Sequence, residues 1–225
     1  MTYFALISLG MLNLYFISSF AILLAFLMSD RMFPIIIYTV RTKNLMDEPV
    51  DRSTHSSKTP TLGGVGVFAT FSVTLLLFGM FLGLQKPDLI KVLGIIGSTT
   101  ILLFLGIKDD LIALAPKKKL IGQIVSSALV IFATDIRIYS FFGLFGIGEL
   151  PYFISVLFSM LVFVFIINAF NLIDGIDGLA GTVAVLISLV FGVFFLVNQN
   201  ILMAVVSAVL IGALLGFLKY NLSDS

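Results

Sequence analysis

The sequence predicts an all-α membrane protein, a polytopic bundle of about seven transmembrane helices. Hydrophobic residues make up 60% of the 225 positions and charged residues only 11%, whereas about 25% of a soluble domain is charged. The apolar residues form seven stretches close to the roughly 20 residues that a helix needs to cross a bilayer. With no cysteine and one histidine, disulfides, cysteine-ligated metals and an all-histidine zinc site within the chain are excluded.

The predicted spans follow one another along the whole chain. The first, Phe4–Met28, is long and lacks a basic start, which favours a true span over a signal peptide. The apolar stretch Met32–Val40 could extend this helix or lie on the membrane surface. The fourth span is short, and the long side chains of Lys117–Lys119 could lend it a further turn. The other six spans are Leu62–Leu84, Leu89–Ile107, Leu120–Thr134, Phe153–Phe170, Leu179–Val197 and Ile201–Leu218.

The longest connection between the later spans is Asp135–Tyr152. Within it, Ile136–Tyr139 predicts a short strand and Gly143–Gly148 a turn. No repeat of fixed period and no low-complexity tract indicates a second domain, so residues 1–225 are expected to form a single transmembrane domain.

The charged residues are concentrated on one side of the predicted bundle. Ten of the 13 Lys and Arg residues lie there: Arg31, Arg41, Lys43, Arg52, Lys58, Lys108, Lys117, Lys118, Lys119 and Lys219. Positive residues mark the cytoplasmic side of membrane proteins, so the N-terminus is predicted to be external. Nine of the 12 acidic residues share the basic side, which favours a functional site there. A net charge of +1 does not indicate a nucleic-acid partner.

Two polar constellations stand out on this side. Asp109 and Asp110 are adjacent carboxylates at a span end, and they would repel each other unless a cation relieves them; two solvated acids are the alternative. Four amide or carboxylate side chains then recur at every third position: Asn168, Asn171, Asp174 and Asp177. One straight helix would drift by 60° at each step, but Gly175 and Gly178 let the chain turn so that the groups converge. The alternative is a polar turn between helices.

Two further segments offer phosphate-compatible donors. His55 and Lys58 precede Pro60 and the pair Gly63-Gly64, a pattern that also fits a helix entry followed by glycine packing. The Lys117–Lys119 run, with Gln123 after it, indicates cytoplasmic anchoring first and a site for anionic lipid second.

These motifs together resemble the polyprenyl-phosphate N-acetylhexosamine-1-phosphate transferase family. The resemblance covers essentially the whole chain, and its most specific motif is Asn168–Gly181. The motifs that carry it occur in one order: Asp47–His55, Thr59–Gly64, Gly106–Asp110, Lys119–Gln123 and Asn168–Gly181. The resemblance implies a fold of about ten spans, of which this chain would form seven. The family's Met-Gly-Asp motif and histidine-rich loop have no counterpart here, so the chain is expected to be the N-terminal portion of the fold and to bind metal and donor weakly.

The resemblance also implies an activity. Such an enzyme transfers an N-acetylhexosamine 1-phosphate from a UDP-sugar to undecaprenyl phosphate, releases UMP, and so initiates a lipid-linked cell-envelope glycan. The expected cofactor is Mg²⁺, or Mn²⁺ in its place, and the expected partners are the UDP-N-acetylhexosamine, undecaprenyl phosphate, membrane lipids and a second copy of the chain. The expected location is the plasma membrane, with the active site facing the cytoplasm.

Several alternatives to this activity stay open. The N-acetylglucosamine subgroup is favoured, with phospho-N-acetylmuramoyl-pentapeptide transfer as the alternative. A family-derived membrane scaffold without activity is another alternative, and an ion-coupled transporter would need charges near the middle of its spans and a repeat between halves.

The resemblance assigns roles to particular residues of this chain. It places Asp109 and Asp110 among the catalytic groups, and Asn171 with Asp110 beside the metal. His55 and Lys119 would bind the lipid phosphate. The nucleotide-sugar would contact Asn168, Asn171, Asp174, Asp177 and Lys58.

Overall fold

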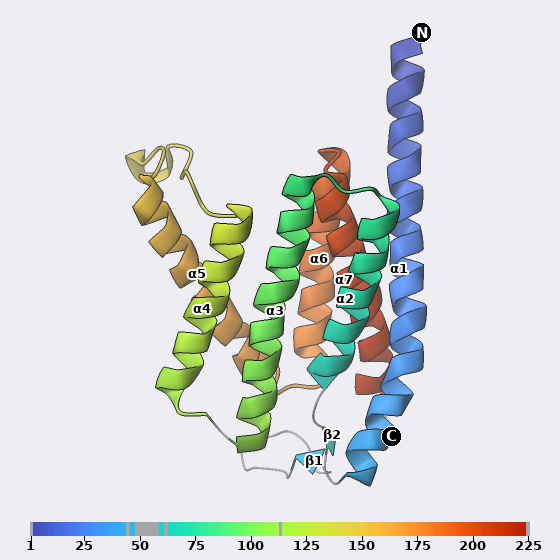
Figure 1. The fold of residues 1–225 in the computed structure, drawn as a ribbon, viewed down its shortest axis with the longest axis vertical. Helices are drawn as coiled ribbons and strands as arrows, with labels where there is room; N and C mark the ends of the chain where they lie inside the picture. The colour runs from blue at the N-terminus through green and yellow to red at the C-terminus, as the bar shows by residue number, and fades with distance from the viewer. Residues whose placement is uncertain (1, 44–45, 48–58, 61–62, 113, 224–225) are drawn as a thin grey trace. The chain divides into compact units, whose positions relative to one another are not determined.

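The computed structural model describes residues 2–43, 46–47, 59–60, 63–112 and 114–223. These residues form seven long helices, labelled in Figure 1: α1 Thr2–Thr42, α2 Gly63–Phe81, α3 Lys86–Ile112, α4 Pro116–Thr134, α5 Tyr152–Ile173, α6 Leu179–Val197 and α7 Ile201–Asn221. A 3₁₀ turn, η1 Leu144–Gly146, and two short strands complete the described elements. The strands, β1 Met46–Asp47 and β2 Thr59–Pro60, are antiparallel and pair Met46 with Pro60.

Each predicted span coincides with one of these helices, which confirms the all-α class. Within the described residues, six helices are long and apolar enough to cross a membrane, so the chain is a multi-pass membrane protein. The seventh long helix, α4, has 19 residues and carries Lys117–Lys119 in its first turn.

The stretch Met32–Val40 extends α1 rather than forming a separate surface segment. Pro34 lies inside this helix and has no N–H, so the carbonyl oxygen of Asp30 loses its usual partner four residues later. The hydroxyl of Tyr220, from α7, lies 3.0 Å from that carbonyl oxygen. This contact explains how a 41-residue helix continues through a proline.

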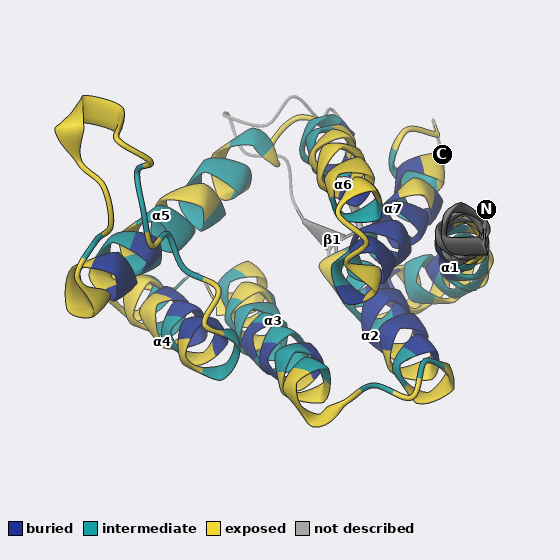
Figure 2. Cartoon of the chain, turned by 90° about the horizontal axis from the view of Figure 1, so that it is seen from above, coloured by how far each residue is buried: buried dark blue, intermediate teal, exposed yellow. Residues whose placement is uncertain are grey.

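The chain divides into two compact units, Met1–Gly83 with Ile173–Ser225, and Leu84–Leu172. In the first unit, α7 packs against α1, α2 and α6 and is buried on most of its faces (Figure 2). A side chain at Gly212 would collide with the backbone of Ile22, and one at Gly216 with Ser29. This small-residue spacing lets α1 and α7 approach closely, and Ser29 Oγ donates to Ala213 O at 2.9 Å.

The second unit contains α3, α4 and α5. Val130, Ile131 and Val156 form its buried apolar cluster, with residues such as Ile95 of α3 packed against it. Because hydroxyls near a bilayer need partners inside the protein, the buried Ser126 Oγ donates to Ser98 O at 2.8 Å and joins α4 to α3.

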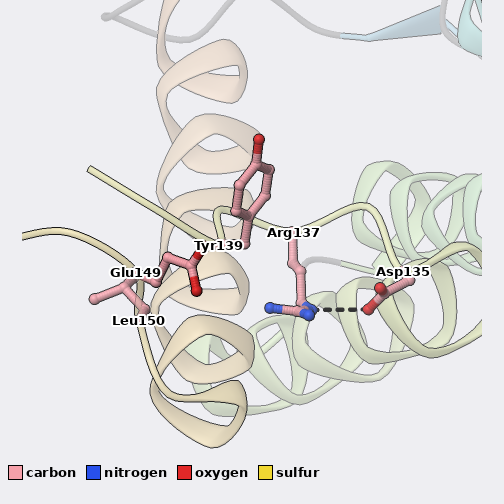
Figure 3. Close-up of a pocket in the computed structure, with 5 residues that line it drawn as sticks. All are labelled: Asp135, Arg137, Tyr139, Glu149 and Leu150. Carbon is pink, nitrogen blue, oxygen red and sulfur yellow. Dashed lines mark hydrogen bonds and ion pairs between the residues drawn. The ribbon is translucent and has the colours of Figure 1, made fainter. Parts of the chain in front are cut away.

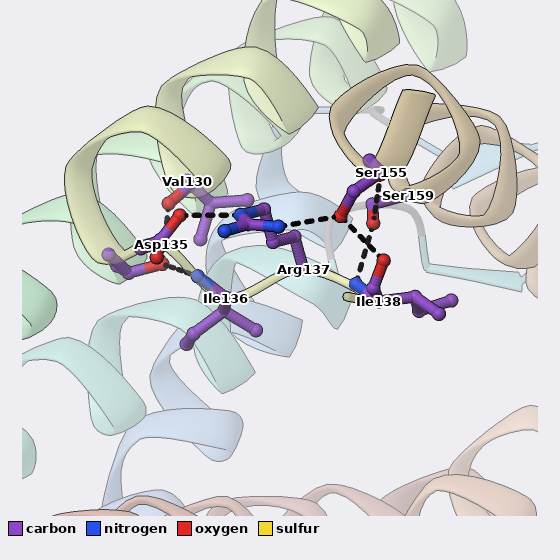
Figure 4. A network of polar contacts seen from close by, with 8 residues as sticks. Val130, Asp135, Ile136, Arg137, Ile138, Ser155 and Ser159 are labelled. Atoms are coloured by element: carbon purple, nitrogen blue, oxygen red, sulfur yellow. Dashed lines mark hydrogen bonds and ion pairs between the residues drawn. The ribbon is translucent and has the colours of Figure 1, made fainter. Parts of the chain in front are cut away.

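The connection between α4 and α5 differs in part from its prediction. The expected strand Ile136–Tyr139 is wrong, because hydroxyls of α5 take the place of a strand partner (Figure 4). Ser159 Oγ accepts from Ile138 N–H at 2.8 Å, and Ser155 Oγ donates to Ile138 O at 2.6 Å. The expected turn at 143–148 is confirmed: it contains η1 and is closed by a bridge between Ser140 and Glu149.

Candidate functional site

Three predicted site residues meet at one end of the second unit. The ammonium of Lys119, on α4, donates to Asp109 Oδ2 at 2.8 Å and to Asn171 Oδ1 at 3.1 Å. Asp109 lies in the last turns of α3, and Asn171 lies in the last turn of α5. One cation therefore holds oxygen atoms from the ends of two other helices.

Local structure at the α3–α4 connection fixes Asp109. Its Oδ1 accepts the backbone N–H of Leu114 at 2.9 Å, so each carboxylate oxygen has a donor. Pro116 then occupies the first turn of α4, where a missing N–H costs little. Lys119 follows one turn later, on the side that faces Asp109.

A pair of amides lies one helical turn further from this end. Gln123 is buried, with 1% of its surface exposed. Asn168 Nδ2 donates to Gln123 Oε1 at 2.9 Å, and Gln123 Nε2 donates to Asn168 Oδ1 at 3.3 Å. Asn168 Nδ2 also donates to Val164 O at 2.8 Å. Buried amides are stabilising only when their polar atoms are paired, so this pair holds α4 and α5 in one register and thereby helps to place Lys119 beside Asn171.

The other half of the Asn168–Asp177 motif belongs to the first unit. The helix α5 ends at Ile173, and the chain turns through Gly178, whose φ is +70°, into α6. The predicted glycine break is thus confirmed. Gly178 N–H donates to Asn221 Oδ1 at 2.7 Å, which ties this turn to the end of α7.

Asp174 lies in this turn, outside the helices, and is exposed to solvent. Neighbouring protein atoms displace part of the water around its carboxyl, and this loss of hydration raises the pKa above the ordinary value. A bound cation would favour the ionised form and oppose this shift.

The oxygen atoms near Lys119 meet only part of what Mg²⁺ requires from a protein. Among the described residues, no three His, Asp or Glu side chains gather around one point. Mg²⁺ is usually held by one or two carboxylates together with substrate phosphates, and the adjacent Asp109 and Asp110 can supply these. Both oxygens of Asp109 accept hydrogen bonds, and the side chain of Asp110 is exposed. These residues fit a metal ion whose coordination is completed by phosphate oxygens of a substrate. They do not fit a metal ion coordinated by protein atoms alone.

The remaining predicted site residues lie away from Lys119 in the sequence or outside the described residues. His55 and Lys58 lie outside the described residues. Asp174 and Asp177 lie in the turn of the first unit, so their convergence with Asp109, Asp110 and Asn171 stays a prediction.

A polar cluster that the sequence reasoning did not single out joins α1 to α7. Lys219 Nζ donates to Asp30 Oδ1 at 2.5 Å, and the Tyr220 hydroxyl lies 3.1 Å from the same oxygen. The proline four residues after Asp30 was the available signal, because it leaves a helix carbonyl in need of a donor.

A bundle of apolar helices with an ammonium, carboxylates and amides gathered at one end defines a class: membrane proteins whose polar site lies at the end of the spans. Residues 92–225 match the model of Glycosyl transferase family 4, and the chain belongs to this family. The resemblance indicated by the motifs is thereby confirmed.

Individual relatives are named for two donors. The chain is 34% identical to a phospho-N-acetylmuramoyl-pentapeptide-transferase of Bacillus subtilis, over 90% of this chain and 66% of that protein. A protein of the same name from Clostridium beijerinckii is 28% identical, over 89% and 64%. A probable undecaprenyl-phosphate N-acetylglucosaminyl 1-phosphate transferase of Bacillus subtilis is 31% identical, over 78% and 48%. The chain spans about two thirds or less of the length of these relatives.

Proposed function

We propose that the protein transfers an N-acetylhexosamine 1-phosphate from a UDP-sugar to undecaprenyl phosphate at the cytoplasmic face of the plasma membrane. The observation that carries this proposal is the ammonium of Lys119 shared between Asp109 and Asn171 at the end of three helices. A lipid phosphate and a water-soluble nucleotide can meet only at such a membrane boundary.

The reaction joins two anions, so the site must neutralise charge and position the reactants. An oxygen of the lipid phosphate forms a bond to the β-phosphorus of the donor. The bond from that phosphorus to the bridging oxygen breaks, and UMP leaves with the electron pair. Lys119 has three N–H groups; two are used by Asp109 and Asn171, and the third can donate to a phosphate oxygen.

Mg²⁺, or Mn²⁺ in its place, would supply charge neutralisation at the diphosphate, held by Asp110 and Asn171. Asp109 orients Lys119, because its Oδ2 accepts from the ammonium at 2.8 Å. Asn168, fixed by Gln123, holds the α5 turn that presents Asn171. Asp174 and Asp177 would then contact the nucleotide.

Two UDP-linked sugars are candidates for the donor substrate. The family resemblance was taken to favour N-acetylglucosamine 1-phosphate, whereas two of the three relatives above are named for the phospho-N-acetylmuramoyl-pentapeptide. The relatives therefore support the second donor at least as well as the first.

The test is an assay of the purified protein with undecaprenyl phosphate and each radiolabelled UDP-donor. We expect labelled lipid diphosphate and one UMP per transfer from one donor, and loss of both products when EDTA removes divalent cations. A folded protein that forms neither product with either donor would contradict the proposal. Ion-driven uptake by vesicles in the absence of transfer would instead identify a transporter.

The proposed orientation gives a separate prediction. Because the sequence contains no cysteine, a thiol reagent would label only an introduced cysteine. Lys86 and Lys118 are both exposed and lie at opposite ends of the second unit. A membrane-impermeant thiol reagent should label Lys86→Cys in intact cells, but should label Lys118→Cys only after permeabilisation. The reverse pattern would place the Lys119 site outside the cell, without access to UDP-sugars.

A further inference from the structure

The connection between α4 and α5 contains a polar hollow that the proposed reaction does not use. It has a volume of about 330 Å³ and is lined by Asp135, Arg137, Tyr139, Glu149 and Leu150 (Figure 3). The hollow lies where α4 ends and α5 begins, whereas Lys119 lies in the first turns of α4. It therefore belongs to the opposite membrane surface from the Lys119 site.

Arg137 is the fixed element of this hollow. Its Nε donates to Asp135 Oδ1 at 2.8 Å, and its Nη1 donates to Ser155 Oγ at 2.9 Å. The guanidinium also stacks over the ring of Tyr152, 4.6 Å from the ring centre. Only 17% of the side chain is exposed. A guanidinium has five N–H groups, so Arg137 can donate to a phosphate oxygen in addition to its hydrogen bonds with Asp135 and Ser155.

The charges around Arg137 select against a simple anion. Figure 3 shows the guanidinium between the carboxylates of Asp135 and Glu149. Asp135 already compensates Arg137, so Glu149 leaves the hollow with one net negative charge. A ligand that pairs with both Glu149 and Arg137 needs an ammonium group for the carboxylate and a phosphate oxygen for the guanidinium.

The loop beyond the hollow displays an apolar tip. Phe142, Leu144 and Phe145 are 83%, 59% and 89% exposed. Phe142 and Phe145 have φ values of 51° and 56°, a left-handed backbone conformation that is unfavourable for residues other than glycine. The loop maintains them through backbone hydrogen bonds such as Phe141 N–H to Gly148 O at 3.0 Å, and through Ser140 Oγ, which accepts from Phe142 N–H at 2.9 Å. Outward aromatic side chains next to span ends are suited to the membrane interface.

We propose that this connection binds the headgroup of an amino-phospholipid from the leaflet opposite the Lys119 site. The primary ammonium would contact Glu149, the phosphate would accept from Arg137, and the apolar tip would lie among the acyl chains. A choline headgroup has the same net charge but no N–H to donate, so the site should distinguish ethanolamine from choline lipids.

The test uses the purified protein in nanodiscs that contain phosphatidylglycerol with equal amounts of phosphatidylethanolamine and phosphatidylcholine. Native mass spectrometry of the released protein then counts the retained lipids. A charged hydrogen bond is worth roughly 1.5–3 kcal/mol, so we expect ethanolamine lipid to be retained at least about tenfold over choline lipid. Glu149→Gln should abolish the preference, because it removes the charge but keeps the shape of an exposed side chain.

Asp88→Asn is the matched control, because Asp88 lies on the same membrane surface, in an ion pair with Lys91. It should retain the preference. The double change Phe142→Ser and Phe145→Ser should lower retention of both lipids equally. Equal retention of the two lipids by the unaltered protein would overturn the proposal. A preference that Glu149→Gln leaves intact would also overturn it. So would a preference that millimolar Ca²⁺ removes, because that result would identify a cation site.

Discussion

Asp109→Asn is expected to lower the kcat of sugar-phosphate transfer about 100- to 1,000-fold, the usual range for a group that acts on charge or protons in a transition state. Asparagine keeps the size of the side chain but removes its charge. Lys119 would lose its carboxylate at 2.8 Å and with it the orientation toward Asn171. The measurement is single-turnover transfer with both substrates saturating.

The opposite end of the same helix offers the control. Asp88 also forms an ion pair with a lysine, at 2.9 Å, and 40% of its side chain is exposed. Asp88→Asn should change kcat less than about twofold, because exposed pairs contribute little. If Asp109→Asn had the same small effect, with an unchanged thermal midpoint, Asp109 would have no part in the reaction.

Lys119→Met is expected to lower kcat/KM for undecaprenyl phosphate about 100-fold. The change removes the proposed phosphate donor and also leaves Asp109 without its cation, each costing on the order of 1–3 kcal/mol. KM for the lipid should rise most, whereas a purely structural role would lower the amount of active protein without moving KM. Lys119→Arg should restore part of the affinity, since it retains the charge.

A double-mutant cycle shows whether Lys119 and Asp109 act as one unit. The combined variant should be little worse than the poorer single variant, because groups that act together are not additive. The Lys91→Met and Asp88→Asn pair is the matched cycle and should show no coupling in transfer. Additive effects at Lys119 and Asp109 would mean that their contact does not contribute to the reaction.

The sequence was sufficient for most of the fold because each span had to satisfy a length and a composition. Leu179–Val197 was predicted to the residue, and the glycine break after Ile173 followed from the three-residue spacing of the amides and acids. The extension of α1 could not be decided from the pattern. It depends on a tyrosine 190 positions away along the chain, and such a contact has no local signal.

The site could be predicted as a set of residues but not as a set of contacts. The motifs named Lys119, Asp109 and Asn171, yet only the packing of α4 between α3 and α5 shows that one ammonium joins them. Gln123 was noticed beside the lysines, but its pairing with Asn168 is invisible without the register of two helices. The strand at Ile136–Tyr139 failed for a related reason: alternation predicts an extended backbone, but the serine hydroxyls that pair with it come from α5.

The length of α1 has a consequence for the bilayer around the protein. At 1.5 Å per residue, the apolar segment Phe4–Met28 is about 37 Å long, several ångströms longer than a hydrocarbon layer of about 30 Å. Such a mismatch is relieved by tilt or by local thickening of the lipid. Because the glycine contacts bind α1 closely to α7, tilt of the one must carry the other, and α7 ends in the turn that holds Lys219, Tyr220 and Asn221. We therefore expect the acyl-chain length of the surrounding lipid to influence the geometry of that polar end.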